Sequence, residues 1–362
     1  MLGFLVLGLT SFMIFTLVKN ALTGTQLRSD ETYMGTVELI IPITHRSEFY
    51  LEPWLKSLHS FRSLQGRLKI HLLIDGHHPA MTAWAELQHK LPFVELHSFA
   101  MRPESSYPVP WMIQQISPQI SSPVVIIGDA ELVAEEAAFI ALARLVSEKK
   151  KPYFVLPQTN KRKLLGESVA VLNPTLSLAS VFGFKKYRRN ISHPLISIAQ
   201  GWIGMPLENF KALEIGKSSL PSWKQSIVRQ WEKEKIDYDL AFGERYLTRY
   251  YPEELSLQIQ QMKIYWEELW LNGDRKGLWL FAASLFIWSF PIICFSSHPF
   301  WAIASIMLLG IYRFFSKVVF QESWRTILLH PIGCIVWLGT FIWWAASGLK
   351  SRYGTQGPEV RS

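Results

Sequence analysis

The chain of 362 residues is long enough for one substantial domain with additional segments, and its formal net charge is +8 at pH 7. Its two cysteines exclude a disulfide framework and a cysteine-based zinc site. The positive charge is compatible with nucleic acid or with an anionic membrane surface as partner. The mean hydropathy of +0.13, together with 15 Trp and 22 Phe, favours the membrane.

Four apolar segments are candidates for crossing a membrane. Residues 2–18 contain no charge and follow no basic stretch, which indicates an uncleaved signal anchor with its amino end outside. Three further segments, residues 277–295, 299–315 and 331–348, have Trp-rich ends that suit a membrane interface. The region between the first two segments is rich in Lys and Arg, so we expect it on the cytoplasmic side of a bacterial inner membrane.

Three full crossings after this region would leave the basic carboxyl tail outside, against the usual excess of positive charge inside. We therefore expect one of the three later segments to be re-entrant or interfacial and not to span, and the alternative is that the charge rule fails here. The expected parts of the chain are a transmembrane anchor at residues 1–18, a cytoplasmic domain at 19–270, a membrane region with two or three hydrophobic helices at 271–349, and a basic tail at 350–362.

In the cytoplasmic region, short β-branched runs alternate with patterns of helical spacing. This alternation predicts an α/β domain built on a mostly parallel sheet with right-handed crossovers. The expected strands are residues 37–43, 68–74, 93–99, 124–127 and 153–156. The expected helices are residues 48–61, 79–91, 108–120, 135–148, 222–235 and 244–251.

Acidic residues follow two of these strands. Asp75 ends the second strand, and Asp129 and Glu131 come just after the apolar run Val124–Ile127. Because the carboxyl ends of parallel strands meet at one edge, where such folds bind ligands, we expect the three carboxylates to converge. Their hard oxygen atoms suit Mg²⁺ or Mn²⁺ shared with a phosphate. The alternatives are a helix cap at Asp129 and a simple Asp-Gly turn at Asp75.

Several other motifs are absent or weak. The sequence has no P-loop, no GxGxxG fingerprint, no GxSxG and no HExxH. His77 and His78, with His71 on the preceding strand, lack a zinc-site spacing, and we expect solvated side chains there. The basic run Lys185–Arg189 suits anionic lipid head groups, with nucleic-acid contact or a solvated face as alternatives.

The order of these features resembles the family 2 glycosyltransferases with a GT-A, Rossmann-like fold, and in particular their membrane-bound, ceramide glucosyltransferase-like branch. This branch includes bacterial enzymes that glycosylate hopanoids and carotenoids. Val37–Pro42 is similar to the family's opening strand, and Ile74–Gly76 to the strand end that holds the donor's uridine. Gly128–Glu131 resembles the Asp-x-Asp metal motif, and Asp237–Ala241 the segment with the catalytic base.

The resemblance implies an integral membrane enzyme that transfers a sugar, with inversion, from a UDP-sugar to the hydroxyl of a membrane lipid. It implies Mg²⁺ or Mn²⁺ at Asp129 and Glu131, Asp237 as the general base, and no nucleic-acid partner. The residues that it places at the donor are Pro42, Thr44, Asp75, Asp129, Lys263, Trp266 and Arg352.

The sequence departs from the family pattern in three places. The Gln-x-x-Arg-Trp motif is degenerate at Gln260–Trp266, where Tyr265 stands in place of Arg. Ile236 stands where the family often has Glu, and the usual Asn-Glu-Glu does not follow the first strand. The alternatives are therefore synthesis of a polyprenyl-phosphate sugar or a polysaccharide, which the degenerate motif disfavours, and an inactive glycosyltransferase-like membrane scaffold.

Overall fold

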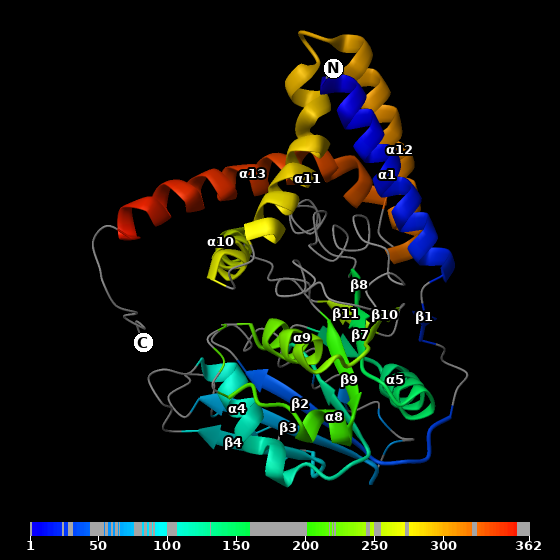
Figure 1. The fold of residues 1–362 in the computed structure, drawn as a ribbon, viewed down its shortest axis with the longest axis vertical. Helices are drawn as coiled ribbons and strands as arrows, with labels where there is room; N and C mark the ends of the chain where they lie inside the picture. Colours follow the sequence, from blue (N-terminus) through cyan, green and yellow to red (C-terminus); the bar gives the residue numbers. More distant parts are fainter. Residues whose placement is uncertain are drawn as a thin grey trace.

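A computed structural model of the chain contains a sheet domain and a group of long helices that projects from it (Figure 1). The residues that it describes are 2–23, 25–27, 32–43, 66–75, 91–99, 107–130, 132–159, 201–216, 222–243, 247–249, 255–271, 275–320 and 324–352, with a few single positions between 54 and 89 and at 218 and 220.

The sheet domain is built on an eight-stranded sheet in which β9 alone runs antiparallel to its neighbours, β5 and β7. The predicted mostly parallel α/β sheet is thus confirmed, and three expected strands have the predicted bounds. In spatial order the strands are β1 (Thr25–Gln26), β10 (Asp239–Phe242), β7 (Tyr153–Leu156), β9 (Trp202–Pro206), β5 (Val124–Ile127), β2 (Val37–Ile43), β3 (Leu68–Asp75) and β4 (Val94–Phe99).

A second, three-stranded sheet corrects one prediction. Its strands are β6 (Leu132–Ala134), β11 (Leu247–Arg249) and β8 (Gln158–Thr159), with β11 in the middle. The helix expected at residues 244–251 is wrong, because residues 247–249 pair with strands on both sides. Two partners from distant parts of the chain outweigh the weak local preference for a helix.

Helices cover both faces of the large sheet. α4 (Pro108–Ile116) and α9 (Trp223–Glu234) pack on the face that carries Ile40 and Leu73, and α5 (Glu136–Lys149) packs on the other. α4 gives way to a 3-10 turn at Ser117–Gln119, earlier than expected, because Pro118 cannot continue an α-helix. The short helix α8 (Leu207–Lys211) follows β9. The expected helices at 48–61 and 79–91 lie mostly outside the described residues.

Five long helices form the projecting part. They are α1 (Leu2–Thr23), α10 (Leu255–Leu271), α11 (Arg275–Cys294), α12 (Pro299–Phe320) and α13 (Trp324–Arg352). α11 and α12 form a hairpin, α1 packs along α12, and α13 lies crosswise to all three (Figure 1). Large apolar side chains on α1 and α12 face outward, including Phe4, which is 70% exposed, and Phe300, which is 72% exposed.

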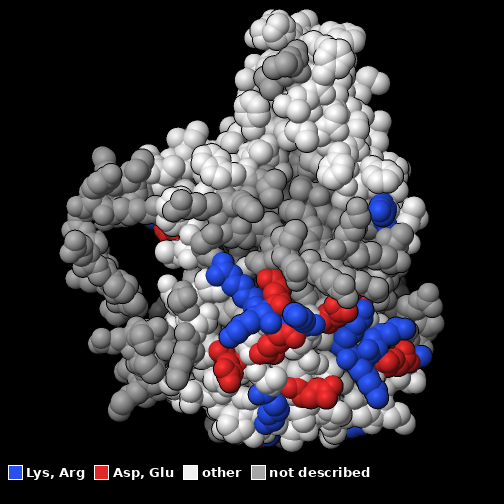
Figure 2. All heavy atoms as spheres, viewed as in Figure 1, with Lys and Arg blue, Asp and Glu red and all other residues white. Residues whose placement is uncertain are grey.

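Charged side chains gather on the sheet domain, whereas the described residues of the projecting tip show none in the same view (Figure 2). Among the described residues, one helix, Pro299–Val319, is long and apolar enough to cross a membrane. Gly3–Lys19, Ala282–Cys294 and Ile332–Ser347 are shorter apolar helices. The apolar character of the four predicted segments is therefore found in helices, and their crossing of a membrane stays a prediction.

Candidate functional site

The carboxyl ends of three neighbouring strands form the edge where the candidate site lies. β2 pairs in parallel with β3 and with β5, so that Ile43 is level with Ile74 and Ile40 with Ile127. Asp129, two residues beyond β5, therefore lies at the same edge as the end of β3. The sequence prediction of a shared edge is confirmed for the backbone.

Asp129 forms a close ion pair at this edge. Its Oδ2 atom lies 2.8 Å from Nζ of Lys224, and the amide N–H of Gly201 donates to the same oxygen at 3.4 Å. The side chains of Asp129 and Lys224 are only 16% and 7% exposed. Removing a charge from water costs several kcal/mol, so each of these charges needs a close partner of opposite sign. The pair therefore places one anion and one cation, both nearly buried, at the carboxyl edge of the sheet.

The residues around Asp129 explain why a glycine precedes it. A Cβ atom on Gly128 would lie 2.5 Å from Nε1 of Trp202, so the strand end accepts only glycine without rearrangement. Trp202 stacks on Trp54 with ring centroids 6.2 Å apart, and Nε1 of Trp54 donates to the Ala130 carbonyl at 2.8 Å. These two indoles fix the turn whose backbone carries Asp129.

Lys224 belongs to the first turn of α9, and the sequence analysis missed it. Ser222 caps this helix by accepting a hydrogen bond from the Gln225 amide at 3.4 Å. The amino end of a helix carries a partial positive charge and free N–H groups, which favour anions. A signal was present, because Lys224, Val228 and Trp231 share one helical face, and a lysine on a buried face requires a carboxylate partner.

Asp237, the expected general base, lies elsewhere. α9 has 12 residues and is therefore about 18 Å long, and it runs from the carboxyl edge toward the opposite edge. Asp237 is exposed in the loop that follows α9 and precedes β10, which runs in the same direction as β5. The structure does not bring Asp237 next to Asp129. Its catalytic role stays a prediction, and this separation disfavours it.

The other expected donor residues are only partly described. Pro42 is buried in β2 opposite Leu73. Asp75 is the last residue of β3 and Arg352 the last of α13, but their side chains lie outside the described residues. Thr44 and Glu131 also lie outside them, as do the runs at 77–78 and 185–189.

Lys263 and Trp266 lie on α10 and join it to α13. Nζ of Lys263 is 3.8 Å from Glu267 and 5.1 Å from the ring centroid of Trp343. Trp266 is fully buried and its Nε1 donates to Oγ1 of Thr340 at 3.3 Å. The contacts of Lys263 with Trp343 and of Trp266 with Thr340 hold the crosswise helix α13 against α10, and the donor-binding role of both residues stays a prediction.

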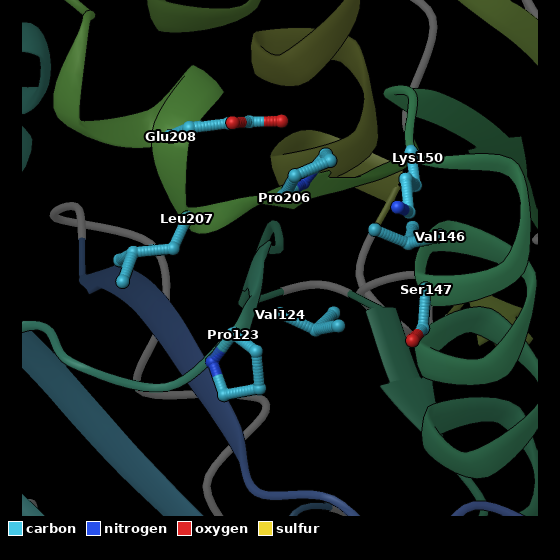
Figure 3. A pocket seen from close by; sticks show the side chains of 8 residues that line it. All are labelled: Pro123, Val124, Val146, Ser147, Lys150, Pro206, Leu207 and Glu208. Atoms are coloured by element: carbon cyan, nitrogen blue, oxygen red, sulfur yellow. The ribbon is translucent and has the colours of Figure 1, made fainter.

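The described part of the protein also has a hollow of about 460 Å³ on a different side of the sheet (Figure 3). It lies where β5 begins, whereas Asp129 follows the end of β5. Pro123, Lys150 and Glu208 are among the residues that line it. It is therefore separate from the Asp129–Lys224 pair.

No protein-family model and no curated protein sequence match the chain. Among solved structures, the chain is similar to the mannosyltransferase PcManGT from Pyrobaculum calidifontis in complex with GDP-Man and Mn²⁺. The TM-score is 0.51 at 10% identity, over 94% of this chain and 98% of that one. A structure of S. aureus TarS 1–349 matches with a TM-score of 0.40 at 13% identity, over 82% of this chain and 89% of that one. The chain has a glycosyltransferase fold. The first match extends this likeness over nearly the whole chain.

Proposed function

We propose that the protein is a membrane-bound glycosyltransferase that uses a nucleotide-sugar and transfers the sugar to a lipid hydroxyl. The observation that carries the proposal is the buried Asp129–Lys224 pair at the carboxyl edge of a sheet with a glycosyltransferase fold. Open α/β sheets bind ligands at this edge. We expect a UDP-sugar as donor, and the match to a GDP-Man complex makes a GDP-sugar the alternative.

Lys224 and the amino end of α9 suit the diphosphate of such a donor. An ammonium group and helix N–H groups together bind phosphate oxygens and compensate their charge. When the sugar leaves, negative charge develops on the nucleoside diphosphate, and a fixed cation at this position stabilises that charge. Asp129 holds Lys224 in place before the donor arrives.

Asp129 offers a single carboxylate ligand to a divalent ion. Oδ2 is bonded to Lys224, which leaves Oδ1 for the ion. Mg²⁺ commonly binds through one or two carboxylates together with substrate phosphates and water, so this donor set fits Mg²⁺ or Mn²⁺. When bound, the ion would neutralise charge on the departing diphosphate.

The helices support a membrane location and a lipid acceptor. α1, α11 and α12 have 22, 20 and 22 residues, about 30 Å each, which matches a bilayer core. If these three cross and the crosswise helix α13 lies in the interface, the basic tail stays on the side of the sheet domain. This arrangement removes the charge conflict that three carboxyl-terminal crossings would create. The expectation that this lipid is ceramide-like rests on the sequence resemblance alone.

The test measures nucleotide binding and transfer with the full chain in detergent. We expect UDP or GDP to bind, with higher affinity when Mn²⁺ is present, and a labelled sugar to appear on organic-soluble lipid. Asp129→Asn should lose the effect of Mn²⁺, whereas Glu135→Gln, an exposed acid at the start of α5, should keep it. If millimolar UDP and GDP both fail to bind the wild-type protein, the inactive scaffold is the better description. A sugar found on a polymer or on a polyprenyl phosphate would instead support the alternative enzyme class.

A further inference from the structure

A cluster of titratable side chains lies on the sheet away from the Asp129 edge. His71 is in the middle of β3, and Glu95 and His97 are on the neighbouring edge strand β4. The three side chains share one face of the sheet, because positions 71 and 95 are paired and position 97 follows two residues later. Their exposures are 0%, 39% and 17%, so the cluster is closed on one side and open to solvent on the other.

The distances within the cluster match the ligands of one tetrahedral ion. Nδ1 of His71 lies 3.0 Å from Nε2 of His97, and each nitrogen lies 3.7 Å from Oε2 of Glu95. Ligands about 2.0–2.1 Å from a tetrahedral Zn²⁺ are about 3.4 Å from one another. The three measured separations bracket this value, whereas cis ligands of a regular octahedron at the same bond length would be about 2.9 Å apart.

The surroundings of His71 prepare its Nδ1 atom to bind a metal. Nε2 of His71 lies 3.1 Å from Oε2 of Glu38, so the Nε2–H donates to this carboxylate and Nδ1 keeps its lone pair. A carboxylate behind a histidine ligand is the usual means of fixing the ring and its tautomer in zinc sites.

Glu38 is itself held firmly. Its Oε1 atom accepts hydrogen bonds from the amide groups and hydroxyls of Ser121 and Ser122, at 3.0–3.2 Å. The side chain of Glu38 is 4% exposed, and these four hydrogen bonds hold its carboxylate in place beneath His71, with Oε2 left for the imidazole.

Lys69 competes with a metal ion for the carboxylate of Glu95. Its Nζ lies 2.9 Å from Oε1 of Glu95, and its side chain is 43% exposed. This contact uses the oxygen that points away from the histidines and leaves Oε2 toward them. An exposed pair of this kind contributes at most about 1 kcal/mol, so Lys69 does not prevent a cation from binding.

We propose that His71, Glu95 and His97 form a Zn²⁺ site with an open fourth position for water, separate from the donor site. Two imidazoles and one carboxylate are a ligand set that zinc uses with water in the fourth position. The bound ion would link the edge strand β4 to β3. Without the ion, the same side chains form a hydrogen-bonded chain from Glu38 through His71 to His97.

The test titrates Zn²⁺ into the full chain, freed of metal and of any polyhistidine tag, in competition with a chromophoric chelator. We expect one bound equivalent in the wild-type protein and intense visible bands of four-coordinate Co²⁺ when cobalt replaces zinc. His97→Gln and Glu95→Gln should lose this equivalent, and Glu38→Gln should weaken it about 10- to 100-fold. His89→Gln changes an exposed histidine outside the cluster and should bind as the wild type does.

Asp129→Asn distinguishes the zinc site from the divalent-ion site proposed at Asp129. This variant should also keep the zinc equivalent. The proposal is overturned if the wild-type protein binds no equivalent, if both glutamine variants at positions 95 and 97 keep it, or if only Asp129→Asn loses it. Far-UV circular dichroism of each variant checks folding. If His97→Gln unfolds, Glu95→Gln decides the question, because Glu95 is partly exposed and glutamine keeps its shape.

Discussion

Lys224→Met tests whether the buried cation binds the donor. Methionine keeps an apolar stem of similar length and removes only the charged group, so the packing of the first turn of α9 is largely preserved. We expect the variant to lose affinity for the nucleoside diphosphate and to lose sugar transfer with it. Both losses follow if Nζ, now 2.8 Å from Asp129, is the group that meets the phosphate oxygens.

The expected size of the effect follows from one hydrogen bond to a charged group. Such a bond contributes about 1.5–3 kcal/mol, and each 1.4 kcal/mol changes affinity tenfold, so Kd should rise roughly 10- to 140-fold. Stability should fall as well. Breaking a buried ion pair costs about 3–5 kcal/mol, and because the Asp129 side chain is 16% exposed we expect the lower end of this range.

The assay is calorimetric titration of the nucleoside diphosphate with and without Mn²⁺, alongside thermal unfolding of the same samples. Lys233→Met, an exposed lysine near the other end of α9, is the matched control and should behave as the wild type does. The double variant Lys224→Met with Asp129→Asn should recover much of the lost stability but none of the affinity. Unchanged nucleotide affinity in Lys224→Met would refute the proposed role of Lys224.

Three further predictions concern other parts of the molecule. Gly128→Ala should destabilise the protein by about 1–3 kcal/mol in thermal unfolding, because its Cβ would overlap Trp202, whereas Gly310→Ala, which meets nothing within 4 Å, should not. Asp237→Asn should keep most of the transfer activity, since this residue lies about one length of α9 from Asp129; loss of turnover with intact donor binding would restore it as the general base. Ser297 lies between α11 and α12, at the end of the hairpin that the proposed topology places outside the cell. Ser297→Cys, in a cysteine-free background, should therefore react with an impermeant maleimide added to intact cells. Reaction only after lysis would contradict the proposed topology.

The parts of the fold that the sequence predicted are those with a strong local pattern. Val37–Ile43, Val124–Ile127 and Tyr153–Leu156 are short apolar runs between turn residues, and each forms a strand with the predicted bounds. The shared edge then follows from the parallel pairing of β2 with β3 and β5. Local chemistry is sufficient for these features.

Other features depend on contacts between distant residues. β9, at Trp202–Pro206, contains glycine and ends in proline, and it becomes a strand because it fits between β5 and β7. The segment at 247–249 has a helical pattern but joins two other strands. In each case the neighbouring strands decide the structure, and the sequence of a single segment does not show which strands these are.

The candidate site shows the same division. Asp129 could be predicted because it follows a buried strand, whereas its partner Lys224 comes from a helix 95 residues later. Asp237 was placed by its similarity to a family motif, and a motif gives order along the chain without the direction of the intervening helix. Because α9 runs from one edge of the sheet to the other, the structure does not bring the residues at its two ends together.

The charges at the candidate site connect metal and donor binding. Asp129 and Lys224 neutralise each other, so the pair alone attracts a diphosphate only weakly. A divalent ion at Asp129 would leave two uncompensated positive charges, which match the two negative charges on the diphosphate of a nucleotide-sugar. Binding of the ion and of the donor should therefore be coupled, and the coupling must be the same in both directions. A nucleoside without phosphates lacks this charge, so its affinity should not respond to Mn²⁺. A response of equal size with the bare nucleoside would place the ion elsewhere.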